Sequence, residues 1–183
     1  MVEHKRSAAL EGALDQIASA PKDQGRLEAI VVRTDVGARQ SLHHVALSAD
    51  GGVAGDHWAK GCWKSLPDGR PDPDVQICIM NARVIRAIAG DIKNWPPAGD
   101  NLFVDLDLGR QNLVPGQRLS VGEAILEITS IPHNGCNKFA ERFGIEATRF
   151  VNSKMGKENR LRGIYAKVVQ DGTVSVADVV TKI

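Results

Sequence analysis

Residues 117–129 read Gln-Arg-Leu-Ser-Val-Gly-Glu-Ala-Ile-Leu-Glu-Ile-Thr, and this stretch decides the fold class. Two segments rich in Leu, Ile and Val stand on either side of the Gly122-Glu123 pair. Polar and apolar residues alternate at the end of the first segment, as they do in a strand with one buried face. Two strands around a two-residue turn that contains glycine form a β-hairpin. The sequence therefore predicts a fold built on antiparallel strands.

Further strands are predicted on the N-terminal side of this hairpin. Residues 27–32 are rich in β-branched side chains, and residues 44–47 form a short candidate strand. Residues 75–80, Val-Gln-Ile-Cys-Ile-Met, are almost continuously apolar, as in a strand that is buried on both faces.

A second hairpin is expected near the end of the chain. Its strands would be residues 164–169 and 173–176, with Asp171-Gly172 at the turn. Together, these hairpins and short strands predict a mainly β fold with short helices. The strands would close as a barrel or form a folded sheet.

Three helices are predicted. Residues 138–152 have helical composition, and residues 82–89 form a short helix that ends at Gly90. Residues 7–20 carry apolar side chains at helical spacing and predict a helix that covers one side of the core, with a dimerisation helix as the alternative. The apolar side chains of that helix are Leu10, Ala13, Leu14 and Ile17.

The proline-rich stretches 67–74 and 95–100 are predicted to be loops, because proline fixes φ and removes a hydrogen-bond donor. Neither resembles a linker between domains, since the strand pattern continues on both sides. We expect one domain over residues 26–183, preceded by a helical extension over residues 1–25.

Composition excludes several classes of function. The net charge of +1 over 183 residues argues against a nucleic-acid-binding protein. The N-terminus lacks the apolar core of a secretory signal, and no apolar segment is long enough to span a membrane. Three widely spaced cysteines, Cys62, Cys78 and Cys136, form no CxxC pair, so we expect a cytoplasmic protein without a zinc ribbon.

Cys136 is the strongest candidate for a reactive residue. It follows the turn-forming sequence Pro132-His133-Asn134-Gly135 and precedes a predicted helix. A thiol at a helix N-terminus faces unpaired N–H groups, and His133 and Lys138 could add positive charge. Such surroundings favour the thiolate, the form that attacks electrophiles and binds soft metals. A plain turn cysteine is the alternative, whereas Cys78, inside an apolar strand, is expected to be a buried hydrophobic residue.

Two loop segments are weaker candidates. In Gly55-Asp56-His57, the carboxylate could accept backbone hydrogen bonds or orient His57, although an ordinary turn needs no ligand. Asn101 can both donate and accept hydrogen bonds, as a residue that binds a heterocycle must, and turn chemistry is again the alternative.

Basic residues provide a last candidate. Arg160 and Arg162, which lie just before the predicted strand 164–169, could grip a phosphate through two parallel hydrogen bonds, and a solvated charged loop is the alternative. No two histidines have the spacing H-E-x-x-H, so a zinc hydrolase is poorly supported.

Taken in order, these segments resemble the MOSC family, the domain found at the C-terminus of molybdenum-cofactor sulfurases and as stand-alone bacterial proteins. The resemblance extends from about Leu27 to Val180, and it depends on the order of its segments rather than on any one motif. The matching segments are Gly52–His57, Val75–Ile77, Gly99–Leu102, Pro115–Ala124, Pro132–Cys136, Arg162–Ala166 and Gly172–Asp178.

The resemblance implies a β-barrel-like domain with a pocket around Cys136, which stands at the position of the cysteine that binds sulfur or ligates molybdenum in the family. Its relatives include the catalytic domain of the mitochondrial amidoxime-reducing component. The implied function is a molybdenum-cofactor-binding protein that reduces N-hydroxylated small molecules, with a separate protein as electron donor. Residues expected to contact the cofactor are Asp56, His57, Asn101, His133, Lys138 and Arg162.

Two alternatives stay open. Cys136 could hold a persulfide or the cofactor for delivery to another enzyme, without catalysis. The domain could also have lost the cofactor and serve as a binding module, because Gly55-Asp56-His57-Trp58 stands where the family often has Gly-Asp-Arg-His.

Overall fold

The computed structural model describes residues 7–183, and strands dominate it. Residues 1–6 of the expected N-terminal extension lie outside the described residues. The strands are β1 (Gly25–Asp35), β2 (Ala38–Leu42), β3 (His44–Ser48), β4 (Gly52–Val53), β5 (Ile77–Asn81), β6 (Leu102–Asp105), β7 (Arg118–Val121), β8 (Ala124–Ile128), β9 (Ile164–Gln170), β10 (Gly172–Ser175) and β11 (Val179–Lys182). The α-helices are α1 (Ser7–Glu11), α2 (Leu14–Ala18), α3 (Trp58–Gly61), α4 (Ala82–Ala89), α5 (Asn137–Asn152) and α6 (Lys154–Glu158).

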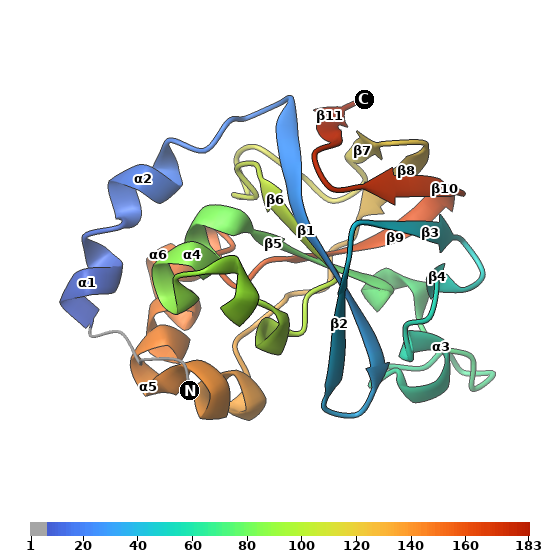
Figure 1. Ribbon diagram of the computed structural model, residues 1–183, viewed down its shortest axis with the longest axis horizontal. Helices are drawn as coiled ribbons and strands as arrows, with labels where there is room; N and C mark the ends of the chain where they lie inside the picture. Colours follow the sequence, from blue (N-terminus) through green and yellow to red (C-terminus); the bar gives the residue numbers. More distant parts are fainter. Residues whose placement is uncertain (1–6) are drawn as a thin grey trace.

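Seven strands form a closed barrel (Figure 1), which confirms the predicted fold class. Their order is β11-β7-β8-β9-β5-β6-β1, and β1 pairs again with β11 through Gly25 and Val180. The pairing of β5 with β6 is parallel, and the other pairings in the barrel are antiparallel. Strand β2 extends the sheet beyond β1, while β10, β3 and β4 form a second, three-stranded sheet.

The predicted hairpin at residues 117–129 is present as β7 and β8, with Val121 opposite Ala124. The second predicted hairpin is wrong. Strand β10 pairs with β3, not with β9, and Gly172 lies opposite Leu47. A Cβ atom on Gly172 would lie 2.4 Å from the backbone of Glu123, so glycine lets the chain pass over the β7–β8 turn and enter the second sheet.

The single helix predicted over residues 7–20 is also wrong in detail, because a break at Gly12 and Ala13 separates α1 from α2. Glycine is a poor residue for a helix interior. The apolar face survives the break, since Leu10 and Ile17 are buried against the helices of the domain. The two proline-rich loops each contain one 3₁₀ turn, Pro73–Val75 and Pro96–Ala98.

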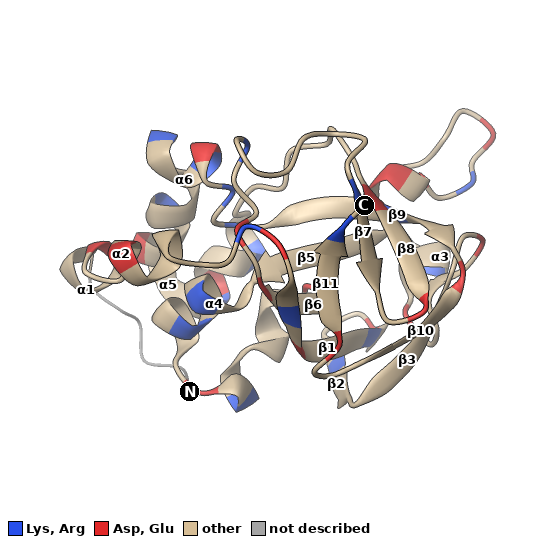
Figure 2. Cartoon of the chain, turned by 90° about the horizontal axis from the view of Figure 1, so that it is seen from above, with Lys and Arg blue, Asp and Glu red and all other residues tan. Residues whose placement is uncertain are grey.

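Two hydrophobic cores follow from the alternation of side chains along the strands. Ile30 of β1 and Ile77 of β5 point into the barrel. Ala29 and Met80, on the opposite faces of the same strands, pack against the helices. Helices α1, α2, α4, α5 and α6 therefore gather on one side of the barrel (Figure 2). Within residues 7–183, none of the helices has the length and apolarity needed to cross a membrane.

Candidate functional site

Cys136 stands at the N-cap of α5, in extended backbone (φ −104°, ψ 178°), and its side chain is exposed. Its carbonyl oxygen accepts hydrogen bonds from the amides of Phe139 and Ala140, both at 3.0 Å, so the helix begins directly after it. The preceding residue is fixed by Asn152, whose side chain exchanges two hydrogen bonds of 2.8 Å with the backbone of Gly135. The thiol is thus held at a defined helix start, where the sequence predicts it.

Helix α5 folds back on itself. Gly144 has φ +88°, a left-handed conformation, and it separates two helical segments, residues 137–143 and 145–152. This reversal brings Val151 and Asn152 against Gly135, on which a Cβ atom would lie 3.0 Å from Val151. Both ends of the α5 sequence therefore meet at the residue before Cys136.

The first turn of α5 packs on a buried ion pair. Nη1 of Arg162 lies 2.9 and 2.7 Å from the two carboxylate oxygens of Asp100, and its Nη2 donates to the carbonyl of Ala98 at 3.0 Å. The Arg162 guanidinium also lies 4.8 Å from the ring centroid of Phe139, in the cation–π range. Burial raises the pKa of Asp100, and the charge of Arg162 opposes that rise.

His133 lies beside this pair. Its Nδ1 is 3.7 Å from Asp100 Oδ1, too long for a hydrogen bond, and its ring packs on Tyr165 with centroids 4.3 Å apart. Burial and the positive charges of Arg162 and Arg33 hold the pKa of His133 well below its usual value, so the imidazole is neutral at pH 7. Nδ1 of His133 and Nε of Arg162 are both buried, and neither has a hydrogen-bond partner within residues 7–183.

A second buried group surrounds Asp56. Its carboxylate accepts hydrogen bonds from Nε and Nη2 of Arg33, each at 2.9 Å, and from Nδ2 of Asn101 at 3.0 Å. Burial acts to raise the pKa of Asp56, but the hydrogen bonds and charge of Arg33 lower it overall. Oδ1 of Asn101 accepts from the amide of Cys78 at 3.1 Å, and Nδ1 of His57 lies 3.8 Å from Asp56 Oδ1.

The structure brings five of the seven expected site residues together at one buried hydrogen-bond network, with the imidazole rings of His57 and His133 beside it and not hydrogen-bonded to it. Asp56, His57 and Asn101 form one half, His133 and Arg162 meet Asp100 in the other, and the peptide bond between Asp100 and Asn101 joins the halves. Other members of the network that sequence reasoning missed as site residues are Arg33, Asp100 and Tyr165.

Cys136 and Lys138 are exposed at the start of α5, and within residues 7–183 their side chains make no hydrogen bond or ion pair with this network. Phe139, in the same helical turn, connects them to the network, because its ring packs on the guanidinium of Arg162. Cys78 is buried, as its apolar strand predicts, and burial raises the pKa of its thiol to about 11.

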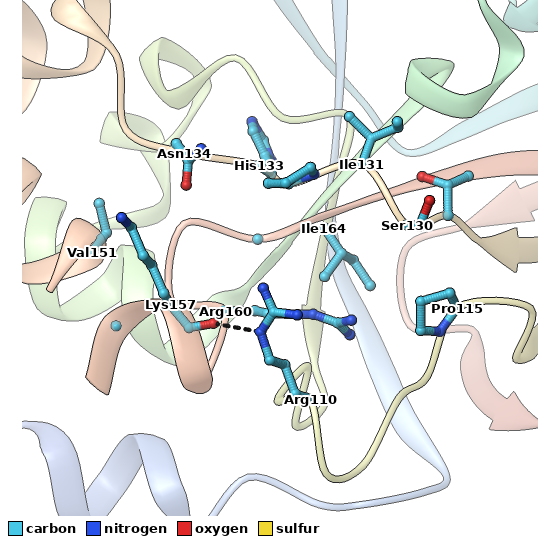
Figure 3. Close-up of a pocket in the computed structure, with 14 residues that line it drawn as sticks. Arg110, Pro115, Ser130, Ile131, His133, Asn134, Val151, Lys157, Arg160 and Ile164 are labelled. Atoms are coloured by element: carbon cyan, nitrogen blue, oxygen red, sulfur yellow. Dashed lines mark hydrogen bonds between the residues drawn. The ribbon is translucent and has the colours of Figure 1, made fainter. Parts of the chain in front are cut away.

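A pocket of about 290 Å³ adjoins the network where residues 129–134 lead toward Cys136. We call it the basic pocket, because Arg110, Lys157 and Arg160 line it and no Asp or Glu does. Figure 3 shows these three side chains on one side of the segment that carries His133 and Asn134, with the side chain of Asn134 turned toward them and the ring of His133 turned away. The sequence alone does not predict this pocket, since Arg110 is distant in the chain from Lys157 and Arg160.

Within residues 7–183, no group of three or more His, Cys, Asp or Glu side chains is arranged to hold a metal ion.

Comparison with known proteins places the chain. The MOSC domain model matches residues 48–181, and no curated protein matches the chain. Among solved structures, the YUAD protein of Bacillus subtilis has 18% identity and a TM-score of 0.59, covering 86% of this chain and 94% of its own.

YiiM from Geobacillus stearothermophilus has 18% identity and a TM-score of 0.55, covering 87% of this chain and 75% of its own. YiiM from Escherichia coli has the same identity and TM-score, and covers 86% and 69%. At such identity these neighbours support the fold alone. The family match extends over most of the chain, and the chain therefore belongs to the MOSC domain family, which is associated with the molybdenum cofactor.

Proposed function

We propose that this protein binds the molybdenum cofactor, with Cys136 as a thiolate ligand of the metal. The observation that supports it most is the placement of Cys136. It is an exposed thiol at a helix start, and the following turn packs through Phe139 on Arg162 of the buried network. Sulfur is the side-chain ligand that suits molybdenum, a metal that changes oxidation state.

The residues present fit the cofactor. A pterin needs hydrogen-bond partners for its ring and positive charge for its phosphate. Nδ1 of His133 is a buried polar atom without a partner in the described chain, and it belongs to a residue that lines the basic pocket. The pocket has three cations and no carboxylate, so it would not repel an anion.

Each group of the chain would have a distinct part. Cys136 would hold the metal, and the Asp100–Arg162 pair would fix the helix start that carries it. The neutral His133 could accept or donate one hydrogen bond at Nδ1. When bound, the cofactor supplies oxygen-atom transfer coupled to two-electron redox chemistry.

The activity we propose is reduction of an N-hydroxylated small molecule. Converting N–OH to N–H consumes two electrons and two protons and releases water. The electrons would come from a separate electron-donor protein.

A second candidate function is delivery of sulfur or cofactor to another enzyme. The exposure of Cys136 favours it, because a persulfide must be reached by the acceptor. In that case Cys136 would carry the sulfur without turnover of a small molecule.

The test is the molybdenum and pterin content of protein purified from a molybdate-fed host that makes the cofactor. We expect near-stoichiometric metal in the parent and its loss in Cys136→Ser, while the matched variant Cys62→Ser keeps it. With metal bound, turnover of an N-hydroxylated compound would separate the reductase from the carrier. No metal in any of the three folded proteins would refute cofactor binding and leave a persulfide carrier or a binding module.

A further inference from the structure

We propose that the basic pocket is a binding site for a phosphate monoester, with Arg110, Lys157 and Arg160 as the residues that hold the phosphate. Cations from two distant parts of the chain converge on one pocket: Arg110 comes from the loop after β6, and Lys157 and Arg160 come from the end of helix α6 and the turn that follows it. Within residues 7–183, no ion pair joins any of these three side chains to a carboxylate.

The three residues are fixed relative to one another by backbone groups. The carbonyl oxygen of Lys157 accepts from Nε of Arg110 at 3.3 Å and from the amide of Arg160 at 3.4 Å (Figure 3). Nη1 of Arg160 donates to the carbonyls of Leu113 and Leu108, at 2.6 and 3.3 Å. Both guanidinium groups are thereby positioned through one nitrogen, and in the described chain their other nitrogens make no hydrogen bond. Those nitrogens are available to an acceptor in the pocket.

The backbone of Arg160 is left-handed because this residue ends helix α6, where the amide of Leu161 donates to the carbonyl of Gly156 at 2.8 Å, as in a Schellman C-terminal cap. Its φ of +48° lies in the left-handed region, which non-glycine residues seldom enter. The next turn holds it there, since the amide of Gly163 donates to the Arg160 carbonyl at 2.8 Å. This helix end fixes the backbone from which the Arg160 side chain reaches the pocket.

The positive charges of the basic pocket lie close together, and no carboxylate lines the pocket to balance them. Burial and the charge of Arg110 lower the pKa of Arg160, and Glu158, which does not line the pocket, opposes them only in part. Two guanidinium groups close enough to repel each other gain from an anion between them. A phosphate monoester carries a charge of about −1.5 to −2 at pH 7 and three acceptor oxygens, which matches the three cations better than a carboxylate does.

The opposite wall of the pocket would receive the group that the phosphate is attached to. Ile131, Pro132 and Ile164 give it apolar surface, and Asn134 gives it a polar edge. A volume of about 290 Å³ leaves room for more than an inorganic phosphate. The phosphate could belong to the pterin of the proposed cofactor, or to a separate phosphorylated small molecule. The first source rests on the proposed function, and the second does not.

The test is titration of cofactor-free protein with inorganic phosphate and with phenyl phosphate at constant ionic strength, followed by calorimetry. Arg110→Gln/Lys157→Gln is the informative variant, because both side chains are exposed and their loss should leave the fold intact. Arg70→Gln, which removes one exposed charge elsewhere, is the control. We expect phenyl phosphate to bind the parent and the control equally, and the double variant at least tenfold more weakly.

Failure to bind phenyl phosphate, or equal binding by all three proteins, would overturn the site. The pterin content of the double variant, purified from the cofactor-competent host, then identifies the source of the phosphate. Loss of pterin together with phosphate affinity assigns the site to the cofactor. Retained pterin with lost phosphate affinity assigns it to a separate phosphorylated molecule. Because the titration uses cofactor-free protein, its outcome is independent of whether Cys136 binds metal.

Discussion

Asp100 and Arg162 form an ion pair inside the protein, with Nη1 of the arginine 2.9 and 2.7 Å from the two carboxylate oxygens. Asp100 lies just before β6 and Arg162 just before β9, so the pair ties together two segments that β5 separates in the barrel. Each charge is tolerated in the interior only because the other is there.

Breaking this pair should destabilise the protein strongly. Asp100→Ala leaves the buried Arg162 charge without a partner, which costs about 3–5 kcal/mol of unfolding free energy in comparable pairs. The control is Asp68→Ala, whose partner Arg70 is exposed and whose loss should have little effect. Urea unfolding measures both. Equal losses of stability would mean that the buried pair does not act as a unit.

His133 should make stability depend on pH below about 6.5. The folded protein holds the pKa of His133 well below 6.5. As the pH falls below 6.5, the unfolded chain therefore binds a proton at His133 that the folded chain does not bind. This contribution is complete above pH 6.5 and is lost progressively as the pH falls, by at most about 1.4 kcal/mol per pH unit. The unfolding free energy of His133→Gln should therefore fall less steeply between pH 6.5 and 5 than that of the parent.

His44→Gln is the control for this experiment, because His44 is exposed. Its stability should follow the parent across the same pH range. Parallel slopes for His133→Gln and the parent would show that His133 takes up its proton without cost.

The cysteines should differ sharply in reactivity. Iodoacetamide at pH 8 should label the exposed Cys136 of the folded protein and spare Cys78, which is buried and whose pKa is raised to about 11. Mass spectrometry of peptides after timed labelling measures the two rates. Cys78 should react only after denaturant is added, and rapid native labelling of Cys78 would contradict its burial.

Gly163 should be intolerant of any side chain. It has φ +108°, and a Cβ atom would lie 2.3 Å from the carbonyl oxygen of Ile79. Gly69 is a matched control, because it also has positive φ, +85°, but open space around it. Gly69→Ala should cost about 1–2 kcal/mol from backbone strain alone. Gly163→Ala should lower the free energy of unfolding in urea by clearly more than this. A similar loss for the two variants would show that β5 and the start of β9 move apart to accommodate the methyl group.

The hairpin β7–β8 and helix α4 could be predicted from sequence because neighbouring residues specify them: a glycine turn in one case, a helical pattern ended by Gly90 in the other. The β10 pairing could not. Asp171-Gly172 predicts a turn, but a turn there is compatible with two pairings of the next strand. That strand could pair with β9, as in a hairpin, or with β3, as it does in the structure. Tertiary packing decides between the two pairings, and the periodicity of the sequence carries no information about that packing.

Some residues of the candidate site could likewise be predicted from their neighbours in the sequence, and others could not. His133 and Arg162 were identified from their places beside Cys136 and a predicted strand, and they do meet at Asp100. Arg160 stands in the segment that the sequence offers as a phosphate-binding candidate, whereas Arg110 and Lys157 carry no such signal, because they lie in segments that look like solvated surface. Such residues become a site only when the fold brings their segments together.

The pairing of Gly25 with Val180 closes the barrel across almost the whole described chain. During synthesis, β1 leaves the ribosome long before β11, and until β11 follows, the edge of β1 at Gly25 and Arg26 has no partner. A contact of such large sequence separation also slows folding. Closure of the barrel therefore waits for the last residues of the described chain, and truncation before residue 179 should give a barrel that cannot close.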